Sequence, residues 1–395
     1  MISSNPDFLK WLIDVRRDFH MHPEVSHEER RTTDKIIEIL KGLDIEIQKF
    51  QEMSGAVGLI KGSGGGPTIA LRADIDALPI QELNNNPYRS INDGVMHACG
   101  HDANTTIMLG IAKKMVESGF TSKMKGNVKF LFQPAEERVF GAKAMIAEGV
   151  LESPRVDRVI AGHMGSDLPA GQVGIFQGQS HASADRFSLL IKGKGAHGGR
   201  PNEGIDPIVA GSFFVTHIQS IIGRNISPTD TAVLTVGKFV AGDVSNVIPE
   251  SAQLQGTIRA LSTATRAFVI RRLKEIVSGL EKTFNVTCDF EIHEGVPPCK
   301  NDKNVATFLY ETASSVLGPE NVRYLPPSTG AEDFAYFSLE RPSAIIRIGC
   351  GNKEKNIVYP LHSPHFDIDE VVLEIGVEVF SEAIKRYFSE NADIA

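Results

Sequence analysis

Apolar residues follow two kinds of spacing along the chain, and the two kinds alternate. Positions with helical spacing predict helices at residues 6–19, 28–40, 104–118, 141–148, 302–317 and 368–388. Short apolar runs between them predict strands at residues 56–60, 68–73, 127–132, 158–161 and 344–348. Strands that alternate with helices favour an α/β fold, here a mostly parallel sheet flanked by helices.

Two local signals refine this pattern. The glycine-rich residues 62–67 predict a turn between the first two strands. At the other end of the chain, Asp367 and Glu370 have the spacing of a capping box, so they predict the start of the last helix.

The pattern changes near residue 180. Strands at residues 187–192, 232–239, 252–260 and 286–293 are interleaved with helices at residues 206–222 and 264–283. This β-α-β-β-α-β order, over about 110 residues, suffices for a small α+β domain of its own. We therefore predict a discontinuous first domain of residues 1–181 and 295–395, with residues 182–294 inserted as a second domain.

Composition narrows the class of protein. A chain of 395 residues is long enough for two domains, and its net charge of −8 argues against a nucleic-acid partner. No apolar run reaches the ~18 residues of a membrane span, and the N-terminus has no signal-peptide pattern. Four cysteines without a repeating spacing fit a reducing compartment. We expect a cytoplasmic protein without a membrane partner.

Polar side chains with catalytic potential follow the predicted strands. Asp74 and Asp76, the pair Glu136-Glu137, and His163 each come at the end of a strand, the edge where α/β sheets bind ligands. A further cluster lies at residues 96–102, where a thiol, two imidazoles and a carboxylate occur within one short stretch. There a glycine separates Cys99 from His101, so the backbone can bend and both side chains can bind one ion.

Each of these signals has a plain alternative. Glu136-Glu137 can be a solvated acidic turn, His163 a hydrogen-bonded core histidine, and His362 part of a proline-flanked surface turn. With Cys99 and His101, the residues Glu137, His163 and His362 make five nitrogen, sulfur and oxygen donors. A thiolate can bridge two divalent ions. Glu136 is then the natural general base. The proposed metal ligands are Cys99, His101, Glu137, His163 and His362.

Six segments in this order resemble the M20 metallopeptidase superfamily, specifically its amidohydrolase branch of hippurate hydrolases, N-acyl-amino-acid deacylases and auxin-conjugate hydrolases. The segments are residues 97–102, 133–137, 195–198, 246–249, 256–259 and 330–334. The resemblance covers nearly the whole chain. It implies two divalent ions per subunit (Zn, Mn, Co or Ni), with Cys99 bridging them and the other four ligands completing the shells.

The resemblance also implies roles for residues that pattern alone does not select. Asp76 corresponds to an acid that orients a metal ligand. The inserted segment corresponds to a lid and dimerisation domain, from which His197 stabilises the oxyanion in the neighbouring subunit's site. Asn246 and Arg259 correspond to groups that bind the substrate's carboxylate or oxyanion. A homodimer or a higher homo-oligomer is therefore expected.

The implied reaction is hydrolysis of the amide bond of N-acyl amino acids by metal-activated water, with Glu136 as the base. One alternative is a dipeptidase- or aminopeptidase-like hydrolase, although peptidase branches have an aspartate where this chain has Cys99. Another is a catalytically silent metal-binding homologue, which would be expected to lack a ligand or the base. Asn104 and Asn202 replace the family's usual histidines, and residues 164–167 replace a proline-containing turn, so the preferred substrate stays open.

Overall fold

The computed structural model describes residues 5–391, which form two compact units. Unit 1 contains the chain up to Gly178, the segment Lys300–Pro326 and the chain from Tyr336 onward, and unit 2 contains Gln179–Cys299 and Pro327–Ala335. The inserted segment predicted at 182–294 falls inside unit 2. The segment around Ser328 belongs to unit 2 as well, because the backbone N–H of Ala182 lies 3.1 Å from the carbonyl oxygen of Ser328 and 2.9 Å from that of Gly330.

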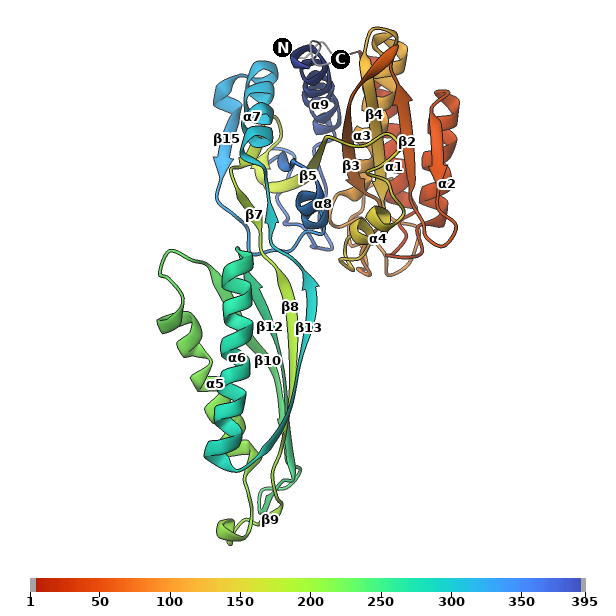
Figure 1. Ribbon diagram of the computed structural model, residues 1–395. Helices are drawn as coiled ribbons and strands as arrows, with labels where there is room; N and C mark the ends of the chain where they lie inside the picture. The colour runs from red at the N-terminus through yellow and green to blue at the C-terminus, as the bar shows by residue number, and fades with distance from the viewer. Residues whose placement is uncertain (1–4, 392–395) are drawn as a thin grey trace. The chain divides into compact units, whose positions relative to one another are not determined.

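Unit 1 is built on an eight-stranded sheet with the order β1-β2-β4-β3-β5-β16-β6-β15 (Figure 1). The central strands β4, β3, β5 and β16 are parallel, so their carboxyl ends meet at one edge. Towards the margins, β1–β2, β2–β4 and β16–β6 pair antiparallel. The strands are β1 Glu46–Lys49, β2 Ala56–Lys61, β3 Gly64–Asp74, β4 Lys125–Gln133, β5 Arg158–Pro169, β6 Val173–Phe176, β15 Val322–Leu325 and β16 Ser343–Gly351.

Helices cover this sheet and share one core with it. The apolar faces of α1, α3, α7 and α9 pack against one another and against the strands in a single cluster of buried side chains. The mostly parallel sheet flanked by helices is the α/β fold that the sequence predicts. The helices are α1 Pro6–Met21, α2 Arg30–Gly42, α3 His101–Glu117, α4 Gly141–Ala147, α7 Lys303–Leu317, α8 Ala335–Glu340 and α9 Val371–Glu390, with short 3₁₀ turns at Phe120–Ser122 and Pro319–Asn321.

Three predicted details of unit 1 are wrong. The turn predicted at 62–67 is partly strand, because β3 begins at Gly64 and pairs there with β4. β5 continues to Pro169 because β16 pairs with it over that length, so His163 lies within the strand and not after it. The predicted capping box is also absent: Glu370 makes no side-chain cap bond and pairs with an arginine of α1 instead.

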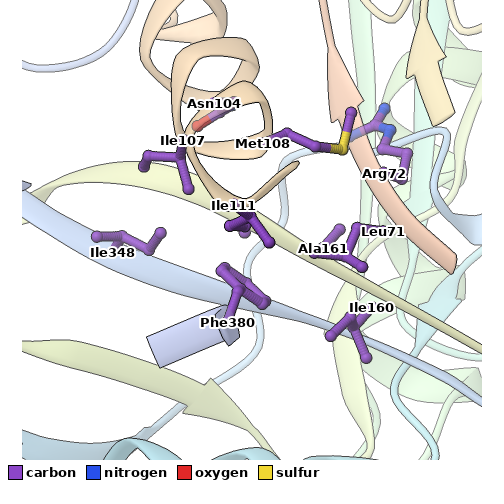
Figure 2. Close-up of a pocket in the computed structure, with 11 residues that line it drawn as sticks. Leu71, Arg72, Asn104, Ile107, Met108, Ile111, Ile160, Ala161, Ile348 and Phe380 are labelled. Carbon is purple, nitrogen blue, oxygen red and sulfur yellow. The ribbon is translucent and has the colours of Figure 1, made fainter. Parts of the chain in front are cut away.

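A small cavity lies inside unit 1, between α3, α9 and the sheet (Figure 2). Figure 2 shows Ile107 and Ile111 of α3 and Phe380 of α9 around it, and Asn104 is also among its lining residues. Its volume of about 20 Å³ is room for one water-sized molecule. Pockets that bind small organic ligands are roughly 300–1,000 Å³, so this cavity is a packing feature and no substrate site.

Unit 2 is a four-stranded antiparallel sheet with the order β10-β12-β8-β13. Helices α5 and α6 lie on the same face of it and share a second, separate core (Figure 1). The sequence order β8-α5-β10-β12-α6-β13 is the β-α-β-β-α-β arrangement. The elements are β7 Gln179–His181, β8 Ala184–Lys192, β9 Ala196–His197, α5 Pro207–His217, β10 Ala232–Ala241, β11 Val247–Ile248, β12 Ser251–Ala260, α6 Thr263–Phe284, β13 Thr287–Val296 and β14 Cys299–Lys300, with a 3₁₀ turn at Pro201–Glu203 and a π-helical turn at Ile221–Asn225.

Among residues 5–391, every helix is either too short or too polar to cross a membrane.

Candidate metal centre

The proposed metal ligands of unit 1 gather at the edge where its parallel strands end. β3 ends at Asp74, β4 runs into Glu136 and Glu137, β5 carries His163, and the loop before α3 carries Cys99. Because β3, β4 and β5 are parallel neighbours, these segments are brought together although they are far apart in the sequence.

The first group of donors contains Cys99, His101 and His163. All three side chains are buried, and their ligand atoms lie within 4.8 Å of one another. The Cys99 Sγ atom is 3.7 Å from His163 Nε2, and the rings of His101 and His163 are perpendicular, with centroids 5.4 Å apart. Donors that bind one ion at about 2.0–2.3 Å stand roughly 3 to 4 Å apart, so this spacing suits a single ion.

The second group shares its thiol with the first. Cys99, Glu137 and His362 also have ligand atoms within 4.8 Å of one another, and His362 Nε2 is 3.4 Å from Glu137 Oε1. A third group joins His101, Glu136 and Glu137 within the same limit. Cys99 thus belongs to the first two groups, and the third group adds Glu136.

Backbone geometry fixes the two loops that carry Cys99 and His362. Gly100 has φ +80°, and a Cβ atom there would lie 2.7 Å from Met164 Cγ, so this position requires glycine. His362 also has a positive φ, +65°, which is unusual for a residue with a side chain. Its backbone N–H donates to the carbonyl oxygen of Ala98 at 2.8 Å, which joins the His362 loop directly to the Cys99 loop.

Asp76 contacts two of the proposed ligands, His101 and Glu137. Its Oδ2 atom accepts hydrogen bonds from the hydroxyl of Ser26 at 2.7 Å and from the backbone N–H of Glu137 at 3.0 Å. Its backbone carbonyl oxygen lies 2.8 Å from His101 Nδ1, and its Oδ1 atom is 3.3 Å from the same nitrogen. Asp76 therefore orients the His101 ring and the backbone of Glu137 together.

The charges at this site favour a cation. Burial alone would raise the pKa of Cys99, but the nearby imidazoles of His101 and His163 lower it to about 6. Hydrogen bonds to Cys99 and, with a smaller effect, to Glu137 raise the pKa of His362 to about 10. A thiolate and a carboxylate that hold protons on their histidine neighbours can hold metal ions in the same way.

The donor set fits a divalent ion of the Zn, Mn, Co or Ni class. Sulfur, imidazole nitrogen and carboxylate oxygen are the ligands that such ions take in proteins. The Nε2 atom of His101 is buried and, within the described part of the chain, has no hydrogen-bond partner. A buried ring nitrogen without a partner is costly, and a bound ion would satisfy it.

Asp74 is a participant that sequence reasoning noted at a strand end but did not select. Its Oδ2 atom lies 3.7 Å from His101 Nε2 and 4.0 Å from His163 Nε2, and it accepts a hydrogen bond from Arg72 at 2.8 Å. Asn104 donates to the other carboxylate oxygen at 2.7 Å. The signal that could have found Asp74 is its two-residue spacing from Asp76, which places both on one face of an extended segment.

The remaining predicted residues lie in unit 2. His197 is exposed on β9 and faces Val247 of β11, and its Nδ1 atom accepts the backbone N–H of Gly199 at 2.9 Å. Next to it, the Gly198 N–H donates to the carbonyl oxygen of Asn246 at 2.8 Å. Thus His197 and Asn246 are neighbours.

Arg259 lies elsewhere in unit 2. It is half-buried near the end of β12, where its guanidinium donates to the carbonyl oxygen of Ile258 at 3.1 Å. The β9–β11 ribbon that carries His197 lies beyond the opposite end of β12, at Ser251. At about 3.4 Å per residue, the stretch from Ser251 to Arg259 alone spans about 27 Å. His197 and Arg259 are therefore at opposite ends of unit 2.

Known proteins resemble this chain over most of its length. The family model described as peptidase family M20/M25/M40 matches residues 70–386. An N-acetylcysteine deacetylase of Bacillus subtilis is 38% identical over 372 residues, which are 94% of this chain and 95% of the relative. The IAA-amino acid hydrolase ILR1-like 4 of Arabidopsis thaliana is 35% identical over 393 residues, 98% of this chain and 88% of the relative.

A solved structure gives the same result. A dinuclear metal binding peptidase of the M20 family from Bacillus subtilis superposes with a TM-score of 0.85 at 34% identity, covering 98% of this chain and 99% of the other. The family match, the sequence relatives and the fold all agree.

Proposed function

Since the chain belongs to peptidase family M20/M25/M40 and is a hydrolase of the amidohydrolase type with a binuclear metal centre, we propose that it cleaves N-acyl amino acids. The products would be a carboxylate and a free amino acid. The observation that carries the proposal is the pair of donor groups that share Cys99, with the carboxylate of Glu136 within 4.8 Å of two ligands. The deacetylase and amino acid hydrolase relatives support the same substrate class.

Glu136 is the proposed general base. It is buried beside His101 and Glu137, so its carboxylate can take a proton from water and pass it to the leaving amine. When bound, two divalent ions polarise the amide carbonyl and lower the pKa of the attacking water. The residues that would hold them are Cys99, His101, Glu137, His163 and His362.

We assign the binding of the substrate's charged groups to residues of unit 2. Arg259 has a planar guanidinium that suits a bidentate bond to the carboxylate of an amino acid. Asn246 adds a neutral donor, and His197 can donate to the oxygen that becomes negative in the tetrahedral intermediate. The bond from Gly199 occupies Nδ1 of His197 and leaves Nε2 for this role.

The distance between His197 and Arg259 supports a homodimer. Two groups at opposite ends of unit 2 cannot serve one substrate of amino-acid size. If Arg259 acts in its own subunit, then His197 acts in the site of a second copy. We therefore assign unit 2 the role of a dimerisation domain as well as a lid.

The two edges of the unit 2 sheet differ in a way that supports dimerisation through β10. The edge strand β13 exposes Asp289, Glu291 and Glu294, charges that prevent strand pairing. The other edge strand, β10, exposes Val233 and Val240, and Lys238 is its single charged residue. An apolar edge of this kind is suited to antiparallel pairing with the same strand of a second copy.

Helix α5 gives the same indication. Its inner face is buried through Ala210 and Phe214, as expected of a helix on a sheet. Its outer face is also apolar, with Ile208, Val209 and Phe213 between 39% and 52% exposed. A helix that is apolar on both faces is typical of an interface. The proposed dimer surface is therefore β10 together with the outer face of α5.

Dipeptide hydrolysis is the alternative from the same family, and a hydrolysis screen separates the two. Metal-free protein would be supplied with Mn, Co, Zn or Ni and offered N-acetyl, N-benzoyl, N-succinyl and aminobenzoyl amino acids beside dipeptides with a free amino group. We expect release of free amino acid from at least one acylated series, and little from dipeptides. Faster cleavage of dipeptides would contradict the proposal, and inactivity towards all substrates despite bound metal would favour a silent homologue.

A further inference from the structure

A buried ionic cluster lies beneath the metal-binding loops of unit 1, and the proposed reaction does not use it. Its centre is Arg16 of α1, whose side chain is fully buried. The Nε atom of Arg16 donates to Asp102 at 2.8 Å, and one terminal nitrogen donates to Asp367 at 3.1 Å. The other terminal nitrogen is 3.5 Å from Glu370. One guanidinium thus contacts three carboxylates.

The first two partners of Arg16 are attached to the two metal-binding loops. Asp102 directly follows the proposed ligand His101 at the start of α3. Asp367 lies a few residues after the proposed ligand His362, in the segment that leads to α9. Asp102 and Asp367 are separated by most of the chain, and Arg16 is a direct link between them.

A second residue also binds each of these two carboxylates. Asp102 Oδ2 lies 2.7 Å from His20 Nδ1, and the opposite ring nitrogen of His20 lies 3.4 Å from Glu82. Asp367 Oδ2 accepts a hydrogen bond from the Tyr88 hydroxyl at 2.8 Å. The centroid of the Tyr88 ring lies 5.1 Å from the guanidinium carbon of Arg16. Because both acids are fixed from two sides, their positions relative to each other are strongly constrained.

The chemistry of this contact requires arginine. A guanidinium directs several N–H groups in fixed directions, so it can bond to two carboxylates at a set spacing, whereas a lysine ammonium is a single point charge. The cluster is buried, so a carboxylate that lost its partner would have to move or draw in solvent. Either response would displace the loop to which that carboxylate belongs.

We propose that Arg16 is a positioning residue for the metal centre: through Asp102 and Asp367 it sets the separation between the Cys99–His101 loop and His362. The inference rests on the metal centre of the proposed function. It assigns a role to α1, which carries none of the proposed ligands.

The neighbouring Arg17 supplies a matched control. It lies on the same helix and makes a two-pronged bond to Glu370, with distances of 2.9 and 2.7 Å. Within residues 5–391 it contacts neither Asp102 nor Asp367, and its side chain is 38% exposed. Arg17→Met therefore removes an arginine between α1 and the start of α9, together with its contact with the Tyr88 ring at 4.4 Å. It leaves the bonds of Arg16 to Asp102 and Asp367 in place.

The experiment is a Co²⁺ titration of the metal-free full-length protein and its variants, followed by visible absorption. Arg16→Met removes the link, and Asp367→Asn weakens it at its less buried end, where folding is less at risk. Outer partners of metal ligands typically contribute about 10- to 100-fold to metal affinity. We expect Arg16→Met and Asp367→Asn to bind Co²⁺ about tenfold more weakly than the wild type and Arg17→Met. Their thiolate charge-transfer and d–d bands should also change.

Two results would overturn the inference. One is a folded Arg16→Met variant, or a folded Asp367→Asn variant if the first does not fold, with the affinity and spectrum of the wild type. The other is a variant that lowers only the unfolding temperature of the metal-free protein, which would show a structural role alone. A wild-type protein that binds no Co²⁺ would instead refute the metal centre itself, so the two failures are distinguishable.

Discussion

The Nδ1 atom of His101 lies 2.8 Å from the backbone carbonyl oxygen of Asp76. A carbonyl oxygen can only accept, so Nδ1 carries the hydrogen and Nε2 of the neutral ring is left with its lone pair. This contact selects the nitrogen that faces the other proposed ligands. The carboxylate of Asp76 reinforces it from 3.3 Å and also holds the backbone of Glu137.

Asp76→Asn should therefore weaken metal binding. The amide keeps the size of the side chain but removes the charge that supports His101, so affinity should fall about 10- to 100-fold. Competition with a chromophoric chelator measures this. Ser26→Ala is the matched control, because it removes one hydrogen bond to Asp76 and leaves the carboxylate, so its effect should be small. An Asp76→Asn protein with wild-type affinity would remove Asp76 from its positioning role.

Cys99 belongs to both donor groups, and its replacement should affect both ions. Cys99→Ala removes the shared ligand, so metal content measured by mass spectrometry should drop from about two ions per chain to one or none. Cys99→Asp should retain more metal than Cys99→Ala, because a carboxylate can also bridge two ions. Cys288→Ala, in the other unit, should leave the content unchanged. Two tightly held ions in Cys99→Ala would contradict the bridging role.

The role of His197 in a second subunit can be tested by mixing two inactive proteins. In a mixed dimer of Glu136→Gln and His197→Ala, one of the two sites receives an intact Glu136 and an intact His197 only if His197 acts across the dimer. Random reassociation should then restore about one quarter of the wild-type activity. Assays before and after unfolding and refolding of the mixture measure this. Activity no higher than that of either variant alone would place His197 in its own subunit or outside catalysis.

Glu29 should make stability depend on pH. Burial raises its pKa to about 7, although the backbone N–H of Ala135 donates to it at 2.8 Å and opposes this shift. As pH rises from about 4.5 to 7, Glu29 loses its proton in the unfolded chain but keeps it in the folded protein. The free energy of unfolding therefore falls over this range, by about 3 kcal/mol in all.

Glu29→Gln removes this titration. From pH 5 to pH 8, the unfolding temperature of the variant should rise relative to that of the metal-free wild type. Glu28→Gln, at an exposed neighbouring position, should show no such trend. A constant difference for Glu29→Gln across this range would contradict the account of Glu29.

The sequence predicts the parts of this molecule that depend on local pattern. Helical spacing finds α1, α3 and α9, and apolar runs find the central strands, because burial of one face leaves a period in the sequence. The order of strands in the sheet leaves no such signal. β16 lies between β5 and β6 although the whole of unit 2 separates them from it in the chain.

The errors have a common physical cause. Asp367 and Glu370 have the spacing of a capping box, but the arginines of α1 bind both carboxylates, and a long-range ion pair replaces the local cap. Asp74 was not selected because the two histidines near it, His101 and His163, come from α3 and from another strand. Asn104 departs from the family's histidine, and the structure shows it hydrogen-bonded to Asp74 and to the backbone N–H of Met164, contacts that no sequence pattern specifies.

The central claim is that Glu136 moves the proton in a metal-dependent hydrolysis. Glu136→Gln preserves the size of the side chain and removes its basicity. The direct measurement is kcat on an N-acyl amino acid, together with metal content for the same sample. The account predicts a fall in kcat of about 10²- to 10⁴-fold with metal content unchanged. A Glu136→Gln enzyme that retains its metal and the wild-type kcat would contradict it.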